Sequence, residues 1–154
     1  MRLVLVCLLA CALSGAARAA ETPRFEDFVA AVEKVEHPAA LRLSDARSRH
    51  YKSQLGEAAD HDVNFAGHYV LASWGCGASC VMSAAVDVKT GAVAWLPFTL
   101  CCWPLEIEEP LEFKPDSRLL IVHGSRNEKG GGTYFYRFDG TRFRLVKAEE
   151  KRGG

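Results

Sequence analysis

The sequence lacks an excess of charge of either sign, because 19 Lys and Arg side chains are balanced by 19 Asp and Glu side chains. Phosphate binding needs a basic surplus, so this balance argues against a general nucleic-acid binder. Beyond its first residues the sequence also has no long apolar run, no domain linker and no low-complexity segment. These absences exclude a multi-pass membrane protein and a disordered chain, and they predict one globular domain.

Motifs for familiar chemistry are missing as well. No Gly-x-Ser-x-Gly segment supplies the nucleophile of a serine hydrolase. The glycine run 130–132 lacks the Lys-Ser/Thr ending of a phosphate-binding loop, so it predicts a flexible hairpin loop. We therefore expect no cofactor, and no set of catalytic or metal-binding residues can be named from the sequence.

What is present begins with an export signal. Arg2 precedes a nearly continuous apolar run from Leu3 to Leu13, and small alanines follow at the positions that a signal peptidase reads. The run is shorter than the roughly 20 residues that span a bilayer core. We predict a secretory signal peptide over 1–19 and a single mature domain over 20–154, periplasmic or extracellular, with no integral membrane segment after cleavage. A lipoprotein cleavage box at 8–11 is the alternative.

Helical periodicity follows the predicted cleavage site. Thr22 and Pro23 are typical of a helix cap and first helical position. Apolar residues then recur at spacings of three and four, namely Phe25, Phe28, Val29, Val32 and Val35. This pattern predicts an amphipathic helix from 22 to about 36 that packs on the domain's own sheet. A second helix is predicted from Ser44, as its cap, to about Leu55, with Gly56 near its end.

Strand signals dominate from Phe65 onward. Expected strands cover 67–74, 80–88, 92–96, 111–113, 118–123, 133–139 and 143–147. The fold class is therefore α+β, with one or two N-terminal helices packed on an antiparallel, meander-like sheet of about six or seven strands. Segments 69–96 and 113–146 have a similar cadence, and the second, through 113–120, weakly resembles a β-propeller blade. Two blade-like units cannot close a propeller.

The most distinctive stretch combines Asn64-Phe65-Ala66-Gly67-His68-Tyr69 with Trp74-Gly75-Cys76-Gly77-Ala78-Ser79-Cys80. With the later turn 87–91, it resembles a group of small secreted bacterial proteins without an assigned activity. The resemblance implies an exported, β-rich protein and carries no mechanism.

Three residues of this stretch are candidate binding residues: Asn64, His68 and Trp74. Each also has a structural interpretation, as a turn residue, a hydrogen-bonded core histidine and a core aromatic. Trp74, Trp95, Trp103 and Phe98 are together compatible with a ligand face or with core packing. The acidic cluster of Glu106, Glu108 and Glu109 is expected on a solvated edge.

Four cysteines follow the predicted signal peptide: Cys76, Cys80, Cys101 and Cys102. In an oxidising compartment they predict disulfides. We expect Cys101 and Cys102 each to reach back to Cys76 or Cys80 across 21 to 26 residues. The alternative pairs Cys76 with Cys80 and Cys101 with Cys102. Metal capture by these pairs, and a nucleophilic thiol with His68 as its base, stay open despite unfavourable spacing.

The leading functional hypothesis is a secreted or periplasmic, non-enzymatic module of the binding or inhibitor type, stabilised by disulfides. Its partner would be an unidentified envelope or extracellular molecule rather than a nucleic acid. One alternative is an envelope enzyme that uses His68 with a cysteine or a carboxylate. Another is a metal-capture protein that uses the cysteine pairs.

Overall fold

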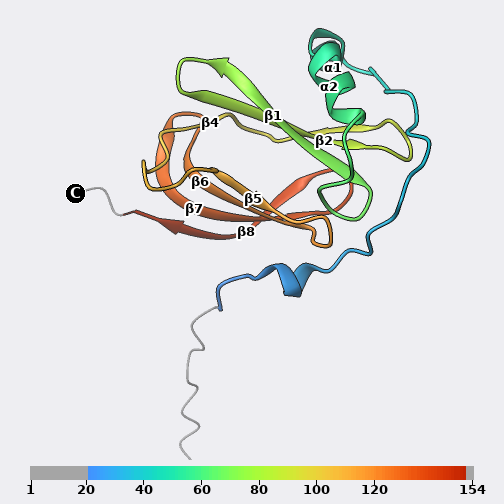
Figure 1. Cartoon of the computed structure of the whole chain (residues 1–154). Helices are drawn as coiled ribbons and strands as arrows, with labels where there is room; N and C mark the ends of the chain where they lie inside the picture. Colours follow the sequence, from blue (N-terminus) through green and yellow to red (C-terminus); the bar gives the residue numbers. More distant parts are fainter. Residues whose placement is uncertain (1–20, 152–154) are drawn as a thin grey trace, which may run out of the picture.

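The computed structural model describes residues 21–151 (Figure 1), so the predicted signal peptide lies outside the described residues. Among these residues, no helix has the length and apolar character needed to cross a membrane. The described elements are a 3₁₀ turn η1 (Phe25–Phe28), helices α1 (Ala46–His50) and α2 (Lys52–Ala59), and strands β1 (Tyr69–Gly77), β2 (Cys80–Asp87), β3 (Val93–Trp95), β4 (Leu100–Cys101), β5 (Leu111–Phe113), β6 (Leu119–Arg126), β7 (Lys129–Phe138) and β8 (Phe143–Glu150).

The strands form one antiparallel eight-stranded sheet in the order β1-β2-β4-β6-β7-β8, with β3 beside β2 and β5 beside β6. Figure 1 shows β1 and β2 in an upper layer, β6 to β8 in a lower layer, and the helices above the upper layer. The α+β class is confirmed, whereas the expected number of strands is too low. Both blade-like segments belong to this single sheet, so no propeller is formed.

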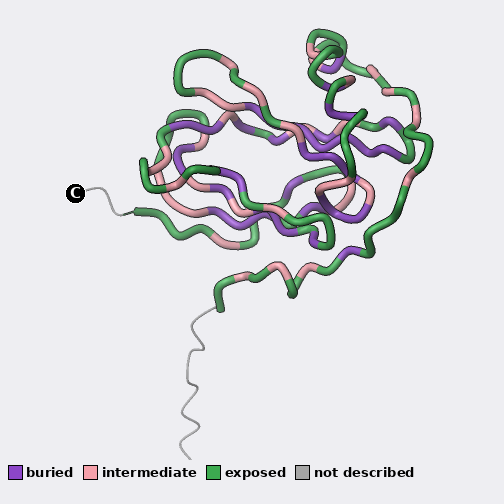
Figure 2. Tube along the Cα trace, in the orientation of Figure 1, coloured by how far each residue is buried: buried purple, intermediate pink, exposed green. Residues whose placement is uncertain are grey.

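The main hydrophobic core lies between the two layers. Tyr134, Tyr136 and Phe138 of β7 share its inner face, as their alternation predicts, and Phe65 and Leu120 contribute fully buried side chains. A second core lies on the other face of β1 and β2, where Leu55 and Ala58 of α2 cover Val70 and Val86. Figure 2 shows these buried stretches along both layers of the sheet. The first half of β1 is therefore buried on both faces although β1 ends the sheet.

The predicted N-terminal helix is wrong. Only Phe25–Phe28 form a single 3₁₀ turn, and the chain then runs extended around the sheet to the helices (Figure 1). Val29 and Val32 of the predicted apolar face are 72% and 54% exposed. The segment instead bonds to loop backbone, through Ala30 N–H to Asp116 C=O and Glu33 N–H to Gly67 C=O. These bonds, together with the low helix propensity of β-branched valines, favour extended backbone over the helix that the spacing suggests.

Two smaller predictions also need correction. The second helix is present but broken at Tyr51, and its cap is Asp45, whose side chain accepts the Ser48 N–H at 2.8 Å. The glycine run 130–132 lies within β7 rather than in a loop. The turn before it uses Asn127 and Glu128, with φ of 50° and 61°, as a two-residue hairpin of type I′ requires. Glycine is needed in β7 because a Cβ at Gly132 would lie 2.3 Å from the Glu149 carbonyl oxygen.

Candidate functional site

Asn64 supports the edge of β1. Its Oδ1 accepts the Leu71 N–H at 2.8 Å, and its Nδ2 donates to the Leu71 carbonyl at 3.3 Å. One residue later, Phe65 pairs with Tyr69 across the same turn. The side chain of Asn64 thus takes the place of a neighbouring strand over one residue of β1.

His68 lies between two carboxylates. Its Nδ1 is 3.3 Å from Glu33 and its Nε2 is 3.7 Å from Asp87. Lys89 also contacts Glu33 at 2.6 Å, and this hydrogen bond holds the pKa of the Glu33 carboxyl below its ordinary value. Among residues 21–151, the ring nitrogens of His68 contact these two carboxylates, and no contact between His68 and a cysteine is found. The group links the extended N-terminal segment to the end of β2.

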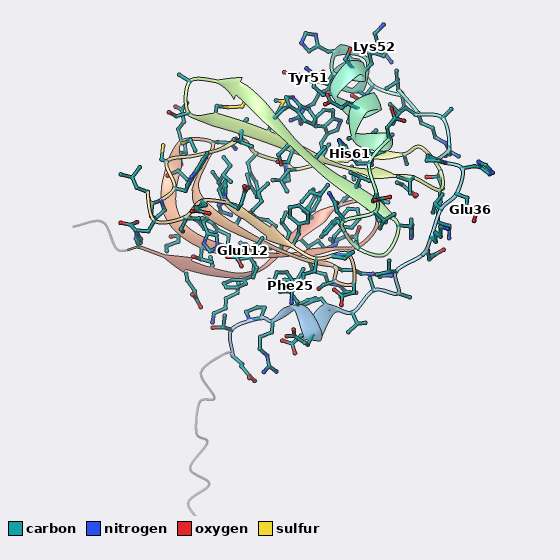
Figure 3. The ribbon with its side chains drawn as sticks, in the orientation of Figure 1. Phe25, Glu36, Tyr51, Lys52, His61 and Glu112 are labelled. Atoms are coloured by element: carbon teal, nitrogen blue, oxygen red, sulfur yellow. A yellow bond between two sulfur atoms is a disulfide. The ribbon has the colours of Figure 1, made fainter. Side chains whose placement is uncertain are left out.

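Trp74 packs beneath the helices, with its ring 5.5 Å from Tyr51 and 5.6 Å from Trp95. Tyr51 is labelled in Figure 3, beside α2. The buried Nε1 of Trp74 has no hydrogen-bond partner among the described residues. An unpaired buried donor of this kind costs stability.

The cysteines do not form the favoured long-range pairs. Cys76 is bonded to Cys80 across the β1–β2 hairpin, with the two Cα atoms 5.1 Å apart. The register shift between Gly75 and Gly77 leaves Cys76 as an extra residue of β1, next to Gly77, which is the residue opposite Cys80. Cys101 lies on β4 opposite Ser125 of β6, so β4 places it in the sheet beside β6 rather than at the hairpin tip.

Cys101 and Cys102 are free thiols whose sulfur atoms lie 2.6 Å apart. Cys101 is buried and Cys102 is exposed. The Cys102 thiol, followed by burial, raises the pKa of the Cys101 thiol to about 11. Since the thiolate is the reactive form, Cys101 is a poor nucleophile near neutral pH.

We expect iodoacetamide at pH 8 to label Cys102 at least about ten times faster than Cys101, because Cys102 is exposed, whereas Cys101 is buried and the pKa of its thiol is raised. Peptide mapping by mass spectrometry measures both rates in one sample. Labelling in denaturant is the control and should bring the rates together. Equal rates in the folded protein would contradict the described burial of Cys101.

Within residues 21–151, no three His, Cys, Asp or Glu side chains lie close enough together to hold a metal ion. His123 contacts Glu112 and Thr133 instead of another histidine, and Glu112 is labelled on β5 in Figure 3.

The best candidate for a ligand site is a cleft of about 440 Å³ beneath β1. Its apolar lining comes from Leu71, Val81, Trp103, Leu111 and Phe113, and Ser73, Trp74, Gly75 and Pro110 complete it. The exposed carboxylates Glu108 and Glu109 lie at its rim. This volume lies within the range of small-molecule sites, and an apolar lining with a few polar groups is typical of them.

A second hollow, of about 230 Å³, lies on the opposite face of β1, between this strand and α2. Gln54, Glu57 and Ala58 of α2 line it, with His61 just beyond the helix. Figure 3 places the labelled His61 near the end of α2 beside β1. Two cavities therefore flank the same stretch of β1, one on each face.

The structure brings only part of the predicted set together. Trp74 and Trp103 share the larger cleft, whereas Asn64 lines the smaller one and His68 lies in neither. Glu108 and Glu109, expected on a solvated edge, are exposed and also form the cleft rim. Phe113, Glu57 and His61 were missed, because nothing in the sequence places β5 or the end of α2 beside β1.

Comparison with protein-family models, with curated proteins and with solved structures finds no match to this chain.

Proposed function

We propose that the protein is an exported, non-enzymatic binding module that takes its ligand in the cleft beneath β1. The observation that carries this proposal is the cleft itself, a concave apolar surface with two aromatic rings, from Trp103 and Phe113, and two carboxylates at one rim. Such a surface complements a ligand with an apolar body and a positive charge, since carboxylates attract cations and aromatic faces bind them. We also propose that the protein acts in the periplasm or outside the cell. Its membership of the secreted group with the same signature is part of the same proposal.

The structural roles of the signature residues support a binding module over an enzyme built on His68. Asn64 and Phe65 shape the entry into β1, and Cys76 and Cys80 close its hairpin. The signature thus builds the strand that forms one wall of the cleft. An inhibitor-type role is one form of such binding.

A charge-matched series of small ligands tests the proposal. We expect 2-phenylethylammonium to shift the NMR signals of Trp103 and Leu111, and to bind better than 2-phenylethanol, with 3-phenylpropanoate weakest. The exposed carboxylates should each contribute about a 2- to 5-fold preference for the cation.

The double variant Glu108→Gln and Glu109→Gln should remove this preference while leaving binding of the alcohol unchanged. The matched control is Glu106→Gln, in the same acidic cluster but outside the lining of the cleft. Absence of any shift in the cleft with all three ligands would contradict the proposed function.

A further inference from the structure

The backbone of β1 is unpaired on one side for part of its length. The N–H and C=O groups of Tyr69 bond to Phe65, and those of Leu71 bond to the Asn64 side chain, on the side away from β2. Backbone groups point to alternate edges along a strand, so those of Ser73 and Gly75 face the same way. In the described chain β1 pairs with no strand other than β2.

The free edge of β1 differs from that of β8 at the other end of the sheet. The outer strand β8 carries Arg144, Lys147, Glu149 and Glu150, and charged side chains of this kind discourage pairing with another chain. The open stretch of β1 from Ser73 to Gly77 carries no charged side chain. The open stretch of β1 therefore lacks the charged protection against strand addition that the β8 edge has.

The two cavities lie above and below this open edge. The smaller one includes Val70, Ala72 and Trp74, whose side chains point to the α2 face. The larger one includes Gly75 and shares Leu71, Ser73 and Trp74 with the smaller one. The side chains of Leu71 and Ser73 alternate along β1 with those of Val70 and Ala72. A strand added at this edge would send successive side chains to opposite faces, and so into the two cavities in turn.

The carboxylates around both cavities select the occupant. Glu57 lines the smaller cavity, and Glu108 and Glu109 line the larger one. A basic segment complements them, whereas a second copy of this chain pairing through β1 would bring the same three carboxylates into the contact. Like charges that face each other disfavour that arrangement.

We propose that the edge of β1 at Ser73 and Gly75 binds an extended basic peptide segment as an additional strand. This inference rests on the proposed function, because it names the ligand class of the same cleft. Main-chain hydrogen bonds to Ser73 and Gly75 supply the part of the affinity that does not depend on the peptide's side chains. Alternation of apolar and basic side chains supplies the selectivity, because successive side chains enter the two cavities in turn.

The test compares peptides by calorimetric titration of the purified protein. The probe is acetyl-Lys-Leu-Lys-Leu-Lys-amide, and the charge control replaces each Lys by Glu. Two further peptides carry N-methyl groups on either the Lys or the Leu residues. We expect the Glu peptide to bind at least about tenfold more weakly, and one methylated peptide to lose binding while the other stays within about threefold.

The matched protein variants are Ser73→Pro and Ser73→Ala. Both remove the hydroxyl that contacts Ser83 at 2.8 Å, but only proline removes the N–H at the free edge. We expect loss of peptide binding in the proline variant alone. The NMR amide signals of β6, β7 and β8, which are remote from Ser73 in the strand order, show that each variant remains folded.

The outcomes separate the two proposals. If the small cation binds but all peptides behave alike, or both methylated peptides lose binding equally, strand addition is wrong and the cleft remains a ligand site. If neither the cation nor a peptide binds, the proposed function fails. Dimerisation of the protein through β1, detected by light scattering, would also overturn the inference.

Discussion

Replacement of Phe65 by alanine lowers the free energy of unfolding by about 3–5 kcal/mol, the usual cost of truncating a buried phenylalanine. The Phe65 side chain is fully buried. Its ring lies 5.4 Å from that of Phe138 and 6.1 Å from those of Phe113 and Phe143. The substitution therefore leaves a cavity in the core between the two layers, because the three aromatic neighbours cannot all move inward to fill it.

Urea unfolding followed by circular dichroism measures this loss. The control is Leu145→Ala on β8, whose side chain is 47% exposed and whose truncation should change stability by less than about 0.5 kcal/mol. A loss for Phe65→Ala no larger than that of the control would show that Phe65 does not organise the core. Because Phe113 lines the cleft, we also expect weaker binding of the phenylethylammonium probe.

The second large effect is expected for Gly91→Ala, at about 2–4 kcal/mol of destabilisation. Gly91 has a φ of +74°, and a Cβ there would lie 1.9 Å from the Ala40 carbonyl oxygen. A left-handed conformation costs an alanine about 1–2 kcal/mol, and the clash with backbone must also be relieved. The segment around Ala40 would move outward and lose the bond from Arg42 N–H to the Gly91 carbonyl.

Gly56→Ala is the matched control with the opposite sign. Gly56 lies inside α2, and a Cβ there would meet no atom within 4 Å. Alanine in a helix is favoured over glycine by about 0.5–1 kcal/mol, so this variant should be more stable than the natural chain. A Gly91→Ala variant as stable as the natural chain would contradict the close approach of Ala40 to Gly91.

The strands were predictable because their signals are local. Alternation of Tyr134, Tyr136 and Phe138 identifies the inner face of β7, and 111–113 is β5 as expected. The order of the strands was not predictable, because the pairings of β4 with β2 and with β6 join residues far apart in sequence. Those pairings depend on how distant segments pack together in the core, and no local sequence pattern indicates this.

The N-terminal segment shows the limit of periodicity. Phe25 to Val35 have the spacing of a helix, yet the segment is extended because its backbone bonds to Gly67 and Asp116. Tertiary hydrogen bonds of this kind outweigh a helical pattern made largely of valines. The prediction of long-range cysteine pairs failed for a related reason, because Cys76 is the extra residue of a register shift in the hairpin and bonds to the nearby Cys80.

The candidate site was recognisable only in pieces. Trp74, Trp103 and the Glu108–Glu109 pair were noted from the sequence as aromatic and acidic features. That they line one cleft follows from the position of β5 and the 102–110 segment beneath β1. The free edge at Ser73 and Gly75 carries no sequence signal at all, since it depends on which strand lies at the end of the sheet.

Amide hydrogen exchange at Ser73 and Gly75, measured by NMR with and without the Lys-Leu peptide, tests the central claim most directly. We expect both amides to exchange quickly in the free protein and at least about tenfold more slowly at saturating peptide, with the amides of β8 unchanged. Unchanged exchange at Ser73 and Gly75 while the peptide is bound, or protection along β8 instead, would contradict strand addition at β1.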